Sequence, residues 1–250
     1  MQRGFLPTSL FAACLALPGI ATAAEPCSDY AAELEVMTTA DQALRKRVDF
    51  LDPESKVQRK LAGHIVLVDR TNTERLKALI ARCGWPSKAA HGEQTPGHAW
   101  LLTQHADHDV AFQKQALALI EEAAAASGEG INRPFAYLYD RVAVAENRPQ
   151  RYGTQLSTGG NNHCALEFAP MEDRAQVEAR RAQLSLPPLD AYKRMVMEMQ
   201  HCPVPPAHSS DRHYAATATG NDSNNQTKVN VSSSGSRDFG RPALKSALER

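Results

Sequence analysis

The chain has 250 residues, with 28 basic and 28 acidic side chains, so its formal net charge at neutral pH is zero. This balance excludes the strongly basic surface on which nucleic-acid binding depends. Aromatic residues make up only 6% of the chain and alanine is abundant, which favours helices packed through small side chains over a β-sandwich.

The first 24 residues have the arrangement of a signal peptide. Arg3 precedes an apolar stretch from Phe5 to Ile20, and the small residues at 21–24 form a cleavage site for a signal peptidase. A membrane anchor and a lipoprotein signal ending at Cys14 are the alternatives. Prolines interrupt the stretch, which also continues past Cys14. We therefore expect cleavage after residue 23 or 24 and export to the periplasm or beyond, with no membrane attachment afterwards.

Four cysteines remain after this cleavage, in a compartment where disulfides persist. Four cysteines allow three pairings, and we favour the pairing of neighbours along the chain, Cys27 with Cys83 and Cys164 with Cys202. No two of them are spaced as zinc ligands are, so no metal site is predicted from the cysteines.

The first half of the domain is expected to be helical. Apolar residues recur at helical intervals from Asp29 to about Leu51, and Pro53 ends that pattern. A second helix follows, and the sequence Thr71-Asn72-Thr73-Glu74 predicts a capping box that starts a third helix. The pair Gly84-Trp85 followed by Pro86 ends the third helix. A loop is expected over Ser87–Gly97, and then a short helix over His98–His105.

The second half continues the helical pattern with one interruption. Helices are expected from about Asp109 to Ala126 and from Pro134 to Asn147, where proline fits a first helical turn. Periodicity is lost over Tyr152–Phe168, which predicts a loop or small hairpin. The last two helices are expected over Glu172–Leu184 and from Pro188 to about His201.

The sequence thus predicts one all-α domain over residues 25–202. Beyond Cys202 the chain is rich in Pro, Ser, Asn and Thr and has almost no large apolar residues. Such a segment cannot bury enough surface to offset its loss of conformational entropy. We therefore predict a disordered tail over Pro203–Arg250.

Several short motifs in the central region resemble, in order, a bacterial family known only as domain of unknown function 6624. The resemblance covers about Val66 to Tyr192, and it implies a fold but no reaction, cofactor or partner. The motifs are Asn72-Thr73, Gly84-Trp85-Pro86, Ala99-Trp100-Leu101-Leu102, Gln104-His105-Ala106-Asp107, Phe112-Gln113, Ala136-Tyr137-Leu138, Asp140-Arg141-Val142, Gln150-Arg151-Tyr152-Gly153-Thr154-Gln155, Pro170-Met171-Glu172-Asp173, Val177, Arg180-Arg181 and Leu186-Pro187-Pro188-Leu189.

Polar side chains embedded in apolar surroundings are the candidates for chemistry, because buried polar groups must pair with one another or face a ligand. They are Gln104, His105, Asp107, Gln113, Asp140, Arg141, Gln150, Tyr152 and Gln155.

In a catalytic pocket, His105 is the predicted general acid or base, because the ordinary pKa of histidine lies near neutrality. Asp107 or Asp140 would orient its ring, and Arg141 would bind a carboxylate, a phosphate or a developing oxyanion. Gln104, Asp107, Tyr152 and Gln155 are the predicted ligand-binding residues. No cofactor motif and no activated nucleophile are recognised.

Two alternatives to a catalytic pocket remain open. The same polar residues would also serve as a hydrogen-bonded network that orients the helices. A metal site is suggested only weakly, by His98 and His105 seven residues apart and by His105 and Asp109 four apart. The functional choice is therefore between an enzyme for a small anionic or amide-bearing substrate and a binding or inhibitor module for a small molecule or protein partner.

Overall fold

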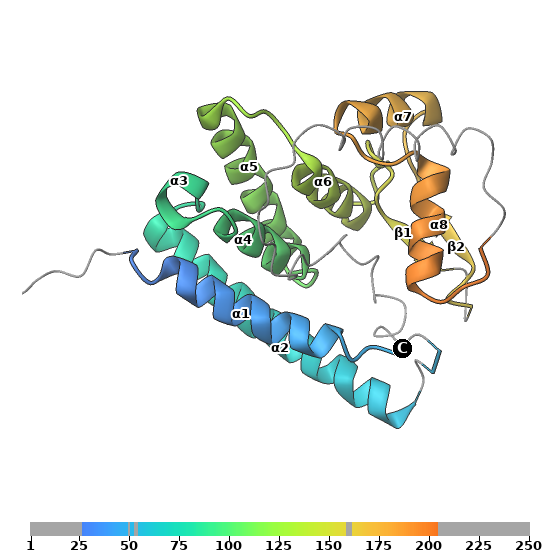
Figure 1. Cartoon of the computed structure of the whole chain (residues 1–250), viewed down its shortest axis with the longest axis horizontal. Helices are drawn as coiled ribbons and strands as arrows, with labels where there is room; N and C mark the ends of the chain where they lie inside the picture. Colours follow the sequence, from blue (N-terminus) through green and yellow to red (C-terminus); the bar gives the residue numbers. More distant parts are fainter. Residues whose placement is uncertain (1–26, 50, 53–54, 159–161, 205–250) are drawn as a thin grey trace, which may run out of the picture.

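The computed structural model describes residues 27–49, 51–52, 55–158 and 162–204. This part of the chain is mostly helical, as predicted, with one two-stranded sheet (Figure 1). Its elements are α1 (Tyr30–Arg45), α2 (Lys56–Cys83), α3 (Lys88–His91), α4 (Thr95–Gln104), α5 (Val110–Ser127), α6 (Arg133–Ala145), β1 (Leu156–Thr158), β2 (Leu166–Phe168), α7 (Arg174–Gln183) and α8 (Leu189–Met199).

The predicted signal peptide at residues 1–24 lies outside the described residues, as does the predicted tail apart from Pro203 and Val204. None of the described helices combines the length and the apolar character needed to span a lipid bilayer.

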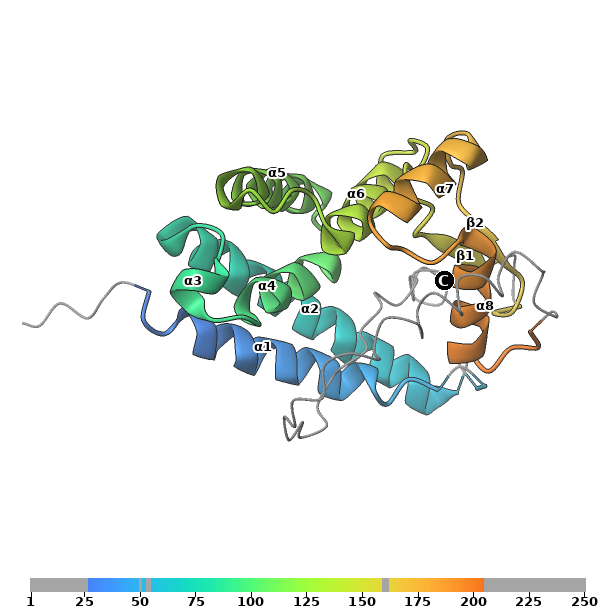
Figure 2. The same ribbon diagram turned by 45° about the horizontal axis from the view of Figure 1, so that its top comes forward.

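Helices α1 and α2 lie side by side and form one flank of the molecule in both ribbon views (Figures 1 and 2). The predicted helix start at Thr71 is wrong, because α2 runs without a break for 28 residues. The hydroxyl of Thr71 donates to the carbonyl of Leu67 at 2.9 Å, and that of Thr73 donates to the carbonyl of Asp69 at 2.8 Å. These hydroxyls therefore bond back into the preceding turn instead of capping a new helix.

The start of α4 also differs from the prediction. The segment expected to be a loop over 87–97 contains the short helix α3, and α4 begins at Thr95, three residues before His98. Pro96 does not prevent this, because it lies in the first turn, where its missing N–H has no helical acceptor to reach.

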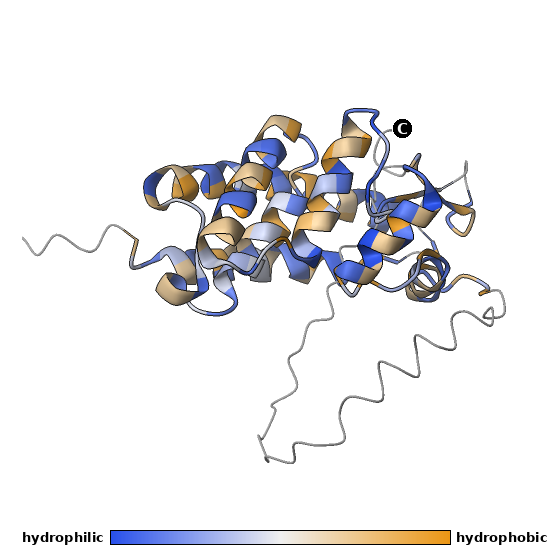
Figure 3. Cartoon of the chain, turned by 90° about the horizontal axis from the view of Figure 1, so that it is seen from above, coloured by the Kyte–Doolittle hydropathy of each residue, from blue (hydrophilic) through white to orange (hydrophobic). Residues whose placement is uncertain are grey.

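Two apolar clusters form the core, and polar and apolar bands alternate around the helices (Figure 3). One cluster lies among α1, α2, α4 and the start of α5, and the other lies among α5, α6, the hairpin and α8. Trp85 packs against both clusters, and Trp100 packs against the second while its indole N–H donates to the carbonyl of Pro134 at 2.7 Å. Both tryptophans therefore serve the core.

Both predicted disulfides are confirmed. Cys27–Cys83 joins the residues before α1 to the end of α2, and Cys164–Cys202 joins the hairpin loop to the residues after α8. Each closes a long loop of the unfolded chain, with sequence separations of 56 and 38 residues. Cross-links of this kind typically stabilise a domain by about 2–4 kcal/mol.

The predicted loop or hairpin near Tyr152 is also confirmed. Strands β1 and β2 pair antiparallel, with Ser157 opposite Glu167. The turn before β1 requires glycine at position 153, where φ is +60° and an added Cβ would collide with the side chain of Leu189. The backbone can therefore approach α8 closely at this point.

Candidate functional site

His105, the residue that ends α4, makes one hydrogen bond from its ring. Its Nδ1 lies 2.9 Å from a carboxylate oxygen of Asp41, which belongs to the middle of α1. The Asp41 side chain is fully buried, whereas 13% of the His105 side chain is exposed. Within the described part of the chain, no hydrogen bond is formed by the other ring nitrogen, Nε2. The ring is thus fixed at one nitrogen and free at the other.

Asp41 belongs to a chain of charges that crosses from α1 to α2. Arg45, one turn after Asp41, donates to Asp41 through Nη1 and to both oxygens of Asp69 through Nη2, at 2.9 Å each. The Arg45 and Asp69 side chains are only 9% and 13% exposed. Asp41 is consequently held from two directions, by Arg45 and by His105.

The pKa values in this cluster favour a neutral imidazole. Burial lowers the pKa of His105, aided by the positive charges of Arg45 and Arg141, and outweighs the opposite effect of Asp41. Burial alone would raise the pKa of Asp41, but the His105 ring and Arg45 lower it below its ordinary value. At neutral pH, Asp41 is therefore an anion that accepts a hydrogen bond from Nδ1–H of a neutral His105 ring. The other ring nitrogen, Nε2, carries a lone pair.

The pKa of Asp69 is raised, in contrast to that of Asp41. Burial raises the pKa of its carboxyl group to about 7, although Arg45 acts to lower it. The cluster therefore contains a group that exchanges a proton near neutral pH.

Arg141 lies beside this cluster and contacts the residues on either side of His105 in the chain. Its Nε donates to the amide oxygen of Gln104 at 2.9 Å, and its Nη1 lies 2.9 Å from both oxygens of Asp107. Gln113 completes the group, because its amide nitrogen donates to the Thr103 carbonyl and to Asp107. Arg141 thus holds the turn that carries His105, and Asp107 pairs with Arg141 instead of orienting the ring.

Asp140, the neighbour of Arg141, lies in a different environment. Its two oxygens accept hydrogen bonds from the backbone N–H groups of Arg151, Tyr152 and Thr154, at 2.8, 3.2 and 2.9 Å, and from the Thr154 hydroxyl at 3.0 Å. Burial nevertheless raises the pKa of Asp140. The expectation that Asp140 orients His105 is wrong, since its oxygens are taken up by the turn before β1.

Two predicted ligand-binding residues, Tyr152 and Gln155, belong to this turn as well. Gln155 donates to the Thr154 hydroxyl at 3.0 Å and to the Tyr137 carbonyl at 3.4 Å, and its own N–H donates to Gln150. Gln150 in turn donates to the carbonyls of Gln155 and Ala169. The structure therefore divides the predicted site into a cluster around His105 and a network around Asp140.

One of the predicted metal pairs, His105 with Asp109, is divided between two helices. His105 ends α4, whereas Asp109 caps the start of α5 by accepting from the N–H of Phe112 at 2.9 Å. The pair therefore does not share a helix face, and Asp109 serves as the N-cap of α5.

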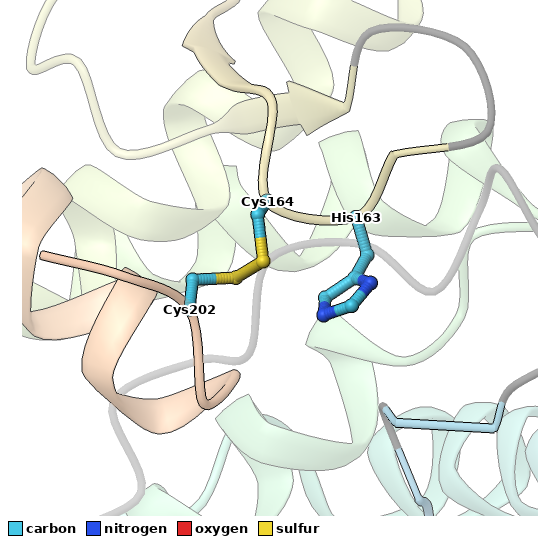
Figure 4. A group of neighbouring side chains, drawn as sticks. All are labelled: His163, Cys164 and Cys202. Carbon is cyan, nitrogen blue, oxygen red and sulfur yellow. A yellow bond between two sulfur atoms is a disulfide. The ribbon is translucent and has the colours of Figure 1, made fainter.

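Two other groups of neighbouring residues are of the kinds that bind metal ions. In the first, the His163 ring lies beside the sulfurs of Cys164 and Cys202 (Figure 4), but their disulfide leaves no thiolate to bind an ion. The second contains Asp41, Asp69 and His105, with ligand atoms within 4.8 Å of one another. Arg45 already contacts both of its carboxylates, so a guanidinium supplies the positive charge there.

Sequence reasoning missed Asp41, Arg45 and Asp69. A signal for Asp41 exists in the sequence, because it lies four residues after Met37 and seven after Leu34, on the buried stripe of α1. A carboxylate on such a stripe requires a partner. The identity of that partner, 64 positions further along the chain, has no local signal.

No curated protein and no solved structure matches the chain. The match to a family model covers residues 28–202, which is more than half of the chain and wider than the resemblance over Val66–Tyr192. It extends to Cys202, the last cysteine of the chain. The model is that of a family of unknown function, DUF6624, and the chain belongs to this family.

Proposed function

We propose that this protein is an exported enzyme in which His105 Nε2 acts as a general base on a small anionic or amide-bearing substrate. The observation that carries the proposal is the ring of His105. One nitrogen is fixed by the buried Asp41 carboxylate, and the other has no hydrogen bond to any described residue. A histidine with only a structural role would be expected to use both nitrogens.

The proposed step is the transfer of a proton to Nε2 from a bound water molecule or a substrate hydroxyl. The oxygen that loses this proton attacks the substrate, and the resulting imidazolium is stabilised by Asp41 until it returns the proton to the leaving group. The nearby charges of Arg45 and Arg141, which help to lower the pKa of His105, would attract a substrate anion. Arg141 would in addition keep His105 in position through Gln104 and Asp107.

Two substitutions of His105, by asparagine and by glutamine, test its role as a general base. His105→Asn keeps an amide N–H near the Nδ1 position and so preserves the bond to Asp41, but it removes Nε2. His105→Gln places its amide near Nε2 and loses the donor to Asp41. On a panel of small esters, amides and phosphate esters, both variants should lose at least about 100-fold in kcat/KM, the usual contribution of a general base.

A measurement that needs no substrate supports this test. Diethyl pyrocarbonate acylates unprotonated imidazole nitrogens, so the mature wild-type protein should be modified at His105. His105→Asn is the matched control, because it lacks the reactive nitrogen and keeps the other histidines. A His105 ring that remains unmodified while the protein is folded would contradict the proposal.

Export is the second part of the proposal. It is supported by the predicted signal peptide, and the two disulfides are compatible with an oxidising compartment. N-terminal sequencing of the exported protein should begin at Ala24 or Glu25. A mature chain that starts at Met1, or at a lipidated Cys14, would exclude the proposed cleavage.

A binding or inhibitor module without catalysis is the alternative. It is favoured by the internal pairing of Arg141, whose side chain is 9% exposed and is held by Gln104 and Asp107. In that case the polar cluster stabilises the fold, and His105→Asn should lower stability without affecting any turnover.

A further inference from the structure

Arg181, on α7, is a buried cation. Only 1% of the residue is exposed, and it is the largest of the fully buried side chains in the described core. Its Nε donates to the carbonyl of Pro187 at 2.7 Å, and its Nη1 donates to the carbonyls of Tyr152 and Gly153 at 2.6 and 3.0 Å. The guanidinium also lies 5.1 Å from the centre of the Tyr192 ring.

No carboxylate neutralises this charge within ion-pair distance in the described part of the chain. The acidic groups whose charges act on Arg181 are Glu178 and Asp140, and both are committed to backbone N–H groups. Burial lowers the pKa of Arg181, but a guanidinium remains protonated at any physiological pH. A full positive charge therefore stays in the core, in direct contact with carbonyl groups and an aromatic face, while the nearest carboxylates that act on it, Glu178 and Asp140, are bonded elsewhere.

Two hydrogen-bond donors near this charge have no acceptor at hydrogen-bond geometry among the described residues. They are Nη2 of Arg181 and the hydroxyl of Tyr137, and both atoms are buried. Burial raises the pKa of Tyr137, while the Tyr192 hydroxyl and the charge of Arg181 act in the opposite direction. Arg181, Tyr137 and Tyr192 lie close together, because the Tyr192 ring centre is 5.1 Å from the guanidinium and 6.1 Å from the centre of the Tyr137 ring. Tyr192 is already bonded to the Thr154 carbonyl at 2.9 Å.

We propose that Arg181 Nη2 and the Tyr137 hydroxyl bind a small monovalent anion such as chloride in the core of the domain. A water molecule could accept the same hydrogen bonds, but it would place no negative charge in direct contact with the Arg181 guanidinium. This site is separate from the His105 cluster and does not depend on the proposed enzymatic function.

Thermal unfolding of the mature protein tests the site. Chloride replaces gluconate at constant ionic strength, so that general screening stays unchanged. An anion that binds only the folded state should raise the midpoint by about 2–4 °C, and the effect should saturate with concentration.

Tyr137→Phe should abolish this dependence on chloride. If the hydroxyl binds nothing, its removal should be neutral or stabilising in either salt. Tyr30→Phe is the matched control, because that hydroxyl donates to the Gly84 carbonyl in the other cluster and its loss should leave the chloride dependence intact.

Crystals grown in sodium bromide give a direct result. An anomalous difference peak next to Arg181 Nη2 and the Tyr137 hydroxyl is expected. A crystal without this peak, or wild-type midpoints that are equal in chloride and gluconate, would overturn the proposal and leave water as the partner of these donors.

Discussion

The two regions on either side of α6 both bury ionic side chains, but they neutralise them differently. Around His105, charges pair with charges: Asp41 with Arg45 and the imidazole, Asp69 with Arg45, and Asp107 with Arg141. Around Asp140 and Arg181, charges pair with the backbone of the turn that precedes β1. The first arrangement leaves a titratable nitrogen free, whereas the second fixes the path of the chain.

This difference indicates separate roles for the two regions. Backbone N–H and carbonyl groups neither titrate nor leave, so a charge bound to them is useful chiefly for holding a loop in place. Side-chain pairs respond to pH and to ligands, because each partner has its own pKa. We therefore expect mutations near Asp140 to act on stability alone, whereas loss of the His105 ring should act on activity and changes to its charged neighbours should also alter stability.

The largest effect on stability is expected for Asp140→Ala. The change leaves the buried N–H groups of Tyr152 and Thr154 without an acceptor, and it should cost on the order of 3–5 kcal/mol in the free energy of unfolding. Urea denaturation of the mature protein measures this loss. Asp190→Ala is the control, because its ion pair with Arg174 is exposed and should contribute less than about 1 kcal/mol.

An Asp140→Ala protein with an unchanged urea midpoint would show that the turn is held by other contacts. The assignment of this region to structure alone would then be wrong.

A smaller loss, about 1–3 kcal/mol, is expected for Arg141→Lys. An ammonium group keeps the charge but cannot bond to Gln104 and Asp107 together, so a buried acceptor loses its donor. The urea midpoint should fall at unchanged slope. Arg148→Lys, at an exposed pair with Glu146, should leave the midpoint almost unchanged.

If Arg141→Lys instead leaves stability intact and lowers activity, the guanidinium binds a ligand anion. Arg141 would then belong to the chemistry of the site instead of positioning His105.

The pH dependence of the free energy of unfolding tests whether the His105 region responds to pH, because Asp69 belongs to that region. Its pKa is about 7 in the folded protein against an ordinary value of 3.8, so the folded state holds the proton more tightly than the unfolded state does. The contribution of Asp69 to stability should therefore be lost as pH rises from about 4 to about 7. Asp69→Asn should remove this contribution, and the stability of the variant relative to the wild type should rise between about pH 4 and about pH 7.

The test is the difference in unfolding free energy between the two proteins at each pH, so that the contributions of unchanged groups largely cancel. A constant difference across this range would mean that Asp69 is ionised in the folded protein and that Arg45 outweighs its burial.

The smallest effect is expected when the chain is ended at Cys202. The sequence of the predicted tail offers almost no apolar side chains, so thermal midpoints of the shortened and full mature proteins should agree within a few degrees. A large decrease would show that residues beyond Cys202 contribute to the folded domain.

Local patterns in the sequence determined the helical fold class and most of the helices, because apolar spacing reports directly which face of a helix is buried. Once export was assumed, the sequence allowed three pairings of the four cysteines, and the favoured pairing of neighbours along the chain is the one in the structure. Local reasoning failed at Thr71–Glu74, where hydroxyls that resemble a helix cap instead bond to the preceding turn of a continuous α2.

The composition of the site was decided only by the tertiary structure. Asp140 and Arg141 are adjacent in sequence, but consecutive residues project about 100° apart around a helix. Asp140 therefore bonds to the turn before β1, and Arg141 bonds to the residues next to His105. The carboxylate that orients His105 comes from α1 instead, because the packing of α1 against α4 brings Asp41 to the ring. The two residues are 64 positions apart in the sequence, a separation at which residue spacing carries no information about contacts.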